Sequence, residues 1–156
     1  PLFLVGSCAA PSIIAEAGPE ATEGRIFNIE GRLEAAEDST DAVDGALYTL
    51  AVLKYGDGLN PVGAGTVSFR GLMNLYAVMT RIGAEDLSSA TIIDALRSSE
   101  DVPSFNGYPY TCATPQVPGL PSLCAPEQVL VEQRDGNLHE VSDGWVPVPE
   151  ILADHG

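Results

Sequence analysis

The stretch "LFLVGSCAAPSIIAEAGPEATEGRIFNI", residues 2–29, decides the fold of this chain. It opens with a short apolar run at 2–5 that a glycine ends, a pattern typical of a strand covered on both faces. Pro11 then suits the first turn of a helix, and Gly18 suits its C-terminal cap. The segment "GRIFNIEG" (24–31) reads as a second strand. Strand, helix and strand in this order predict a βαβ unit, and therefore an α/β fold with a parallel sheet.

Further along the chain, the periodicity predicts three amphipathic helices, at about 38–54, 68–83 and 86–99. We expect Gly83 to close the second helix and Ser88 or Ser89 to cap the third. Apolar positions at helical spacing should face inward. They are Val43, Leu47 and Leu50 in the first helix, Phe69, Leu72, Leu75, Tyr76, Met79 and Ile82 in the second, and Ile92, Ile93 and Leu96 in the third.

The last third of the chain has the patterns of loops and strands. Six prolines between residues 101 and 126 predict loop or edge strand there. The segment after residue 126 alternates in polarity around Asp135-Gly136, which is a strong hairpin pattern. Three helices between a βαβ unit and a hairpin do not form one doubly wound sheet, so the elements should serve two layers or lobes.

The charge of the chain restricts its partners. It has 22 acidic and 7 basic residues, a net charge of −15, so it lacks the basic surface that nucleic acid requires, and an anionic membrane surface is disfavoured for the same reason. It holds no run near the roughly 18 apolar residues of a membrane helix. The start, "PLFLVGSC", superficially resembles a lipoprotein signal, but it lacks a basic segment and its apolar run is short.

Two cysteines, Cys112 and Cys124, bracket the proline-rich loop "YTCATPQVPGLPSLCAP". A metal site, a redox pair and a structural disulfide are the alternatives. The spacing is much wider than that of paired zinc ligands, only Cys8, His139 and His155 could add to the set, and no C-x-x-C motif is present. A structural disulfide fits best, and it would indicate an oxidising compartment. We expect no metal and no cofactor.

Candidate binding residues are few. Ser7 follows the first strand, where ligands of open α/β sheets bind, and Phe69 and Arg70 lie near a helix start and either line a pocket or only pack there. Cys8 precedes a helix, a position that can activate a thiol, so a cysteine or serine hydrolase using Cys8 or Ser7 is a third alternative. It lacks the G-x-S-x-G pattern, and no histidine pairs with it by spacing, so a buried, inert Cys8 is the plainer interpretation.

The acidic segment "EAAEDSTDAVDG" does not have the spacing of a calcium loop. We expect its carboxylates to be solvated at the start of a helix, where they favour the helix dipole. They are Glu34, Glu37, Asp38, Asp41 and Asp44.

In their order and spacing, these pieces resemble the C-terminal part of the type I periplasmic substrate-binding proteins, the branched-chain amino-acid receptor group of ABC transporters. The pieces are "LFLVGSCAAPSIIAEAGPEATEGRIFNI", "VSFRGLMNLYAVMTRIGAEDLSSATIIDALRSS", "FNGYPYTC…C" and "QVLVEQRDGNLHEVSDGW". The likeness spans nearly the whole chain, and no single motif within it is specific.

The resemblance implies a partial two-lobe architecture of parallel sheets flanked by helices, with a C-terminal hairpin. Residues 1–30 would end the sheet of the second lobe, and 34–104 would give helices of the first. Residues 105–126 would cross back as a disulfide-stapled segment, and 127–156 would finish the second lobe. The family is about twice this length, so the resemblance implies a C-terminal fragment whose N-terminal part is missing.

The resemblance also implies a function without catalysis: an extracytoplasmic receptor, in the periplasm or at the cell surface, that delivers a small polar ligand to a membrane permease. A lipid anchor would belong to the missing N-terminus. Ser7 and Phe69 lie near the family's ligand-binding positions, but the acid that holds an amino-acid ammonium group is absent around Ser7. A ligand-sensing domain of a receptor or regulator with the same fold is the alternative.

Overall fold

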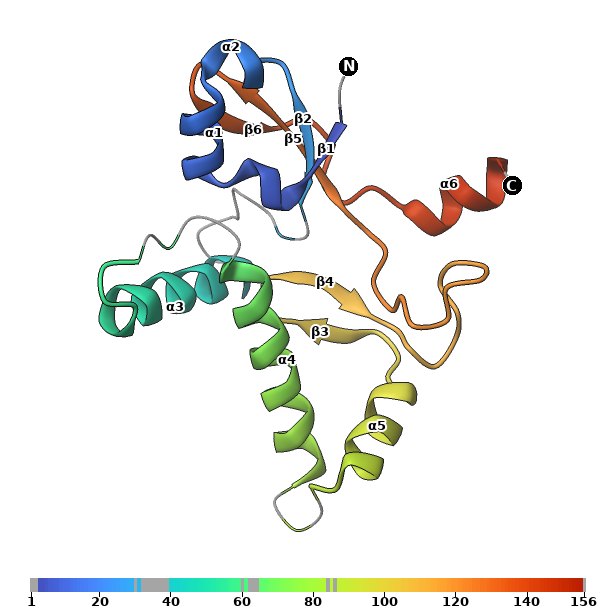
Figure 1. The fold of residues 1–156 in the computed structure, drawn as a ribbon. Coiled ribbons are helices and arrows are strands. Elements are labelled where there is room, and N and C mark those ends of the chain that lie inside the picture. Colours follow the sequence, from blue (N-terminus) through green and yellow to red (C-terminus); the bar gives the residue numbers. More distant parts are fainter. Residues whose placement is uncertain are drawn as a thin grey trace.

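The computed structural model of the chain describes residues 3–29, 31, 40–59, 61, 65–83, 85 and 87–155, without the side chains of Ser7, Thr40, Asp41 and His155. Figure 1 shows two groups of elements joined by crossing segments: a small sheet with short helices, and a group of three longer helices with a two-stranded hairpin.

The sheet has four strands in the order β1-β2-β5-β6: β1 (Phe3–Val5), β2 (Ile26–Ile29), β5 (Val129–Arg134) and β6 (Asn137–Glu140). The first two strands are parallel, as predicted, and the others pair antiparallel. The sheet is therefore mixed rather than purely parallel, because the C-terminal hairpin adds its two strands to the βαβ unit.

Short helices connect β1 to β2: η1 (Gly6–Ala9), α1 (Pro11–Ala17) and α2 (Pro19–Thr22). The predicted helix is confirmed, and it ends at Gly18, which adopts a φ of +85° that favours glycine. The Gly18 N–H donates to the carbonyl of Ile14 at 3.0 Å and so satisfies one of the free carbonyls at the end of α1.

The predicted hairpin between β5 and β6 is also confirmed. Asp135 and Gly136 have φ values of +50° and +79°, and both central residues of a type I′ turn need a positive φ. The local sequence is thus sufficient to specify this turn.

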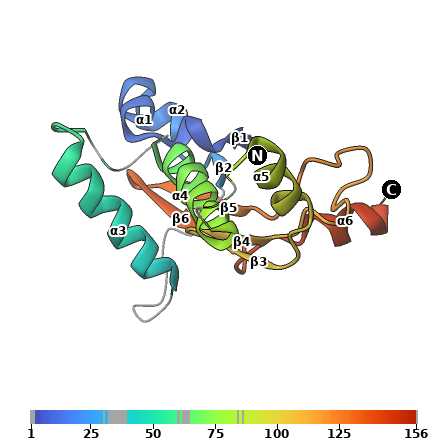
Figure 2. The same cartoon turned by 90° about the horizontal axis from the view of Figure 1, so that it is seen from below.

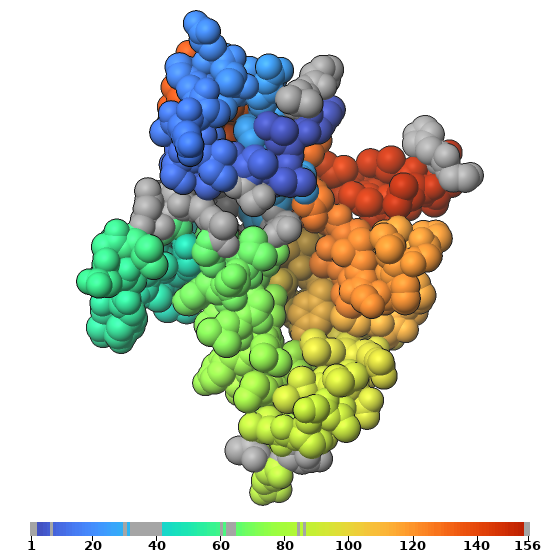
Figure 3. Space-filling model, viewed as in Figure 1, coloured from blue at the N-terminus to red at the C-terminus, as the bar shows by residue number. Residues whose placement is uncertain are grey.

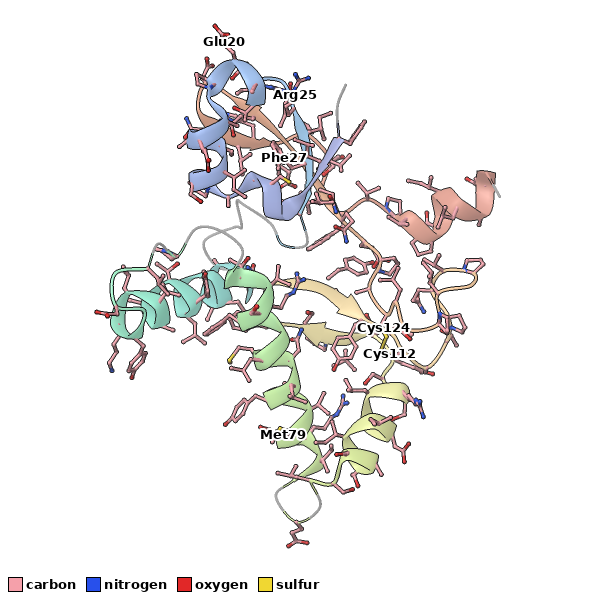
Figure 4. All side chains as sticks on the ribbon, in the orientation of Figure 1. Glu20, Arg25, Phe27, Met79, Cys112 and Cys124 are labelled. Carbon is pink, nitrogen blue, oxygen red and sulfur yellow. A yellow bond between two sulfur atoms is a disulfide. The ribbon has the colours of Figure 1, made fainter. Side chains whose placement is uncertain are left out.

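One face of the sheet carries the core. Phe27, Val129 and Val131 are fully buried, and Ala9 of η1 packs with them (Figure 4 labels Phe27). The other face differs from the prediction: Phe3 is 59% exposed and Val5 is 60% exposed. Side chains alternate along a strand, and no described element covers the face to which these two point.

The three predicted helices are present as α3 (Thr40–Tyr55), α4 (Gly65–Ile82) and α5 (Ser89–Arg97). Gly83, with a φ of +91°, closes α4 by donating to the carbonyl of Met79 at 3.1 Å. Ser88 caps α5, since its hydroxyl accepts the N–H of Thr91 at 3.2 Å.

The predicted inward faces of these helices are wrong in part. The fully buried residue of α4 is Val78, which lies outside the predicted stripe, and the described residue of α3 that is buried is Tyr48. Several predicted core residues are instead open to solvent by 39–64%, because the described elements pack against these helices on one side only. They are Val43, Leu47, Leu50, Leu72, Leu75, Tyr76 and Ile93.

The proline-rich part of the chain forms an antiparallel pair, β3 (Val102–Ser104) and β4 (Gly107–Tyr110), and then a long loop. The chain ends in α6 (Val148–His155), which the sequence analysis did not predict. Figures 1 and 2 both show α6 projecting from the side of the molecule opposite to α3. None of the described helices is long and apolar enough to cross a membrane.

Candidate functional site

The backbone of Ser7 lies in η1, directly after the carboxyl end of β1. Gly6 makes this turn possible, because a Cβ atom there would lie 2.6 Å from the carbonyl oxygen of Asn28 on the neighbouring strand. The Ser7 side chain lies outside the described part of the structure. Its ligand contact therefore stays a prediction.

Phe69 lies in a cluster of three aromatic rings from separate segments. Its ring is 5.2 Å from that of Tyr48 on α3, edge to face, and 5.5 Å from that of Phe105 in the β3–β4 turn. Burial raises the pKa of the Tyr48 hydroxyl. Such edge-to-face geometry is favourable for aromatic rings. Phe69 therefore has a packing role at the junction of α3, α4 and the hairpin, whether or not it also meets a ligand.

Two helices hold the β3–β4 turn beside this cluster. Asn74 of α4 accepts the N–H of Phe105 at 2.7 Å and donates to the Ser104 hydroxyl at 2.9 Å. Asp44 of α3 accepts the N–H of Asn106 at 2.7 Å. The tie at Asp44 corrects the prediction that this carboxylate is merely solvated, because the turn lies 62 residues away in sequence. The side chains of the other predicted carboxylates, Glu34, Glu37, Asp38 and Asp41, lie outside the described part.

Two side-chain contacts lie where the chain passes between the sheet and the helical group. The Asn28 amide donates to the Gln128 side chain at 3.0 Å, so the end of β2 and the approach to β5 are linked. The ring of Tyr108 meets that of Trp145 edge to face, with centroids 5.5 Å apart. Trp145 also packs against the core of the sheet. The Tyr108–Trp145 pair therefore joins β4 to the segment that follows β6.

Cys112 and Cys124 form a disulfide, with Cα atoms 4.7 Å apart (Figure 4). The Thr111 N–H donates to the carbonyl of Cys124, and the Cys112 N–H donates to that of Ser99, each at 2.9 Å. Inside the closed loop, Val117 is only 7% exposed. The loop is thus a packed structural unit, tied both to β4 and to the end of α5.

Among the described side chains, the residues proposed for hydrolase chemistry are not assembled. Cys8 is half-buried and packs against the core of the sheet, which matches the interpretation of an inert thiol. His139 lies on β6, at the opposite edge of the sheet from the strand that leads to Cys8. The side chain of His155 lies outside the described part. Among the described residues, no group of three or more His, Cys, Asp or Glu side chains could hold a metal ion.

An open recess of about 390 Å³ lies between α4, the β3–β4 pair and the end of the disulfide loop. Sequence reasoning did not find it, because its lining comes from five separate segments. The lining residues are Arg70, Asn74, Leu96, Ser104, Gly107, Tyr108, Tyr110, Leu123, Cys124, Ala125, Glu127 and Gln128. Burial raises the pKa of the Glu127 carboxyl, and a backbone hydrogen bond opposes this effect.

Two solved structures are similar to this chain. One is a leucine-binding protein, LivK, from Thermotoga maritima, with a TM-score of 0.59 and 19% identity over 90% of this chain and 36% of that protein. The other is a branched-chain amino-acid ABC transporter protein from Thermus thermophilus with bound valine, with a TM-score of 0.61 and 19% identity over 99% of this chain and 41% of that protein.

No protein-family model and no curated protein matches the sequence. The structural likeness confirms the predicted fold: the chain has the architecture of part of a type I periplasmic binding protein. It spans about two fifths of the length of either binding protein.

Proposed function

We propose that this chain is the C-terminal part of the solute-binding component of an ABC transporter, which binds an amino acid or a related small polar ligand without catalysis. The observation that supports the proposal most is the fold shared with two amino-acid-binding proteins over 90% and 99% of the chain.

In this proposal, residues 1–30 and 127–156 belong to one lobe, residues 34–104 to the other, and residues 105–126 cross between them. The N-terminal part of the same protein would complete both lobes. The exposed apolar side chains of β1, α3 and α4 are consistent with surfaces that further chain would cover.

Ligand binding would act by closing the lobes. A ligand held between η1 of one lobe and the start of α4 of the other contacts both only in the closed state, so it favours closure by its difference in affinity. Ser7 and Phe69 are the proposed contacts. The Asn28–Gln128 hydrogen bond and the Tyr108–Trp145 pair would then lie at the hinge.

The proposed location is extracytoplasmic, and the proposed partner of the closed receptor is a membrane permease. The disulfide supports this location, because such bonds persist in oxidising compartments and are rare in the cytosol. A lipid anchor would belong to a segment outside this sequence.

Thermal unfolding of the complete natural protein with a panel of amino acids, amides and aromatic acids tests the proposal. A true ligand at about 100 times its Kd should stabilise the protein by about 2.7 kcal/mol. Phe69→Ala should weaken the binding of that ligand, while Tyr55→Ala, at an α3 ring outside the proposed ligand contacts, should not. If no compound binds, or if the complete protein carries a signalling domain, the transport proposal is wrong, and the second outcome favours a ligand-sensing domain.

A further inference from the structure

The recess beside the disulfide has walls of different chemistry. Figure 3 shows it as a hollow between α4 and the loop that ends at Cys124. Tyr108 and Tyr110 of β4 contribute its aromatic part, and Glu127 contributes a carboxylate from the side of the loop. Its volume of about 390 Å³ lies within the range of small-molecule pockets.

Most other hydrogen-bonding side chains of this recess already have partners. Asn74 bonds to Ser104 and to the Phe105 N–H. The Gln128 side chain bonds to Asn28 and to the carbonyl of Glu127. Within the described residues, no side chain donates to the Glu127 carboxylate and no cation forms an ion pair with it. Burial has removed part of its hydration, and a backbone hydrogen bond compensates for this loss only in part.

A partly desolvated carboxylate beside aromatic rings is the combination that recognises an organic ammonium ion. The carboxylate supplies the charge-assisted hydrogen bond, and the ring faces attract the cation and pack against its methylene groups. The net charge of −15 raises the local concentration of any cation near the surface.

We propose that this recess binds a small organic cation, a primary ammonium group on a short aliphatic chain, with Glu127 as its counter-ion and the rings of Tyr108 and Tyr110 beside its methylene groups. Among the described lining residues, Glu127 is the one carboxylate, so the ligand class is a monoamine. The proposal does not rest on the receptor function above, because it uses neither Ser7 nor Phe69.

The test is calorimetric titration of the 156-residue chain with n-butylammonium chloride at pH 7 and low ionic strength. We expect saturable binding of n-butylammonium, and no binding of n-butanol or butyrate. Glu127→Gln should weaken the binding at least tenfold. Glu100→Gln, which removes an exposed carboxylate that lies outside the recess, should leave the affinity unchanged.

Further variants show whether a loss of binding in Glu127→Gln comes from the lost charge or from a change in the fold. Glu127→Asp retains the charge and should retain measurable binding, and the circular dichroism of each variant should match that of the parent. Phe69 does not line the recess, so this titration and the ligand panel of the complete protein test different residues. Equal binding of n-butanol, or unchanged affinity in Glu127→Gln, would overturn the proposal, as would the absence of saturable binding.

Discussion

At the scale of single residues, Asn74 joins two segments that lie about 30 residues apart in sequence. Its amide bonds the turn between β3 and β4 twice, to the Phe105 N–H and to the Ser104 hydroxyl. Asn74→Ala leaves a partly buried N–H without a partner, so we expect the free energy of unfolding to fall by roughly 1–3 kcal/mol. Urea denaturation measures this change.

A matched control for this prediction is Asn137→Ala. The Asn137 side chain also bonds to the backbone, but it donates to the carbonyl of Asp135, two residues away in the exposed β5–β6 hairpin. Asn137→Ala should therefore lower the free energy of unfolding much less than Asn74→Ala does. An equal loss in both variants would show that the clamp on the β3–β4 turn contributes nothing special.

The pH dependence of stability is a second prediction at this scale. Burial raises the pKa of Glu127 in the folded chain above its ordinary value of 4.5, so folding disfavours the ionised carboxylate. This penalty is complete above the folded pKa and disappears as the pH falls below about 4.5.

Glu127→Gln removes the charge, and we therefore expect the variant to be more stable than the parent at pH 7. The difference should shrink toward zero near pH 4, because the parent carboxyl is then protonated in both states. Urea midpoints of the two proteins between pH 4 and pH 8 measure it. A parent that is more stable at pH 7 would mean that Glu127 has a cationic partner in solution.

Local residue patterns were sufficient where the physical cause is local. Gly18 and Gly83 end helices because their positive φ favours glycine, and Ser88 caps α5 through a residue three positions away. The roles of Asp44 and Asn74 could not be predicted, because their partners lie 62 and about 30 residues away. Hydrogen bonds between side chains of distant segments produce no recognisable pattern of residue spacing in the sequence.

At the scale of elements, the disulfide-closed loop allows the contribution of a covalent link to the free energy of unfolding to be measured. Cys112 and Cys124 are 12 residues apart, and closing such a loop stabilises by about 3 kcal/mol in the chain-entropy model. The double variant Cys112→Ser/Cys124→Ser should lose about that much free energy of unfolding, measured in urea.

The control for this prediction is chemical reduction. Dithiothreitol should destabilise the parent by a similar amount and leave the double variant unchanged. If the reduced parent keeps its urea midpoint, the packing of Val117 and the hydrogen bonds to Ser99 already hold the loop, and the disulfide adds little.

Periodicity and turn chemistry predicted that α3, α4, α5 and the β5–β6 hairpin exist, and about where they end. They did not predict which face each helix buries. An apolar stripe in the sequence shows that one face of a helix is hydrophobic. Whether that face is buried depends on which other elements pack against the helix. For the same reason the recess near Glu127 could not be predicted, whereas the βαβ unit could, because its strands are adjacent in sequence.

At the scale of the whole molecule, the balance of buried and exposed apolar surface is unusual. Ten of the described large apolar or aromatic side chains on three elements are each at least 46% exposed. They are Phe3 and Val5 on β1, Val43, Leu47, Leu50, Leu53 and Tyr55 on α3, and Val67, Leu72 and Tyr76 on α4. A stable monomer rarely exposes so many apolar side chains together. The small sheet buries side chains on one face only, so it contributes a limited apolar core.

We therefore expect the isolated chain to self-associate through α3 and α4. In sedimentation velocity the average mass should rise above 16.3 kDa as concentration increases, and the association should strengthen with kosmotropic salt, as hydrophobic contacts do. The double variant Leu50→Gln/Leu72→Gln leaves the net charge unchanged and removes two of the most exposed apolar side chains, so it should shift the distribution toward monomer.

Thr49→Gln, at an exposed polar position of α3, is the matched control and should behave as the parent. The parent could instead sediment as a single 16.3 kDa species at every concentration. The exposed apolar faces would then be stable in water, and they would no longer support the proposal that a further segment covers them.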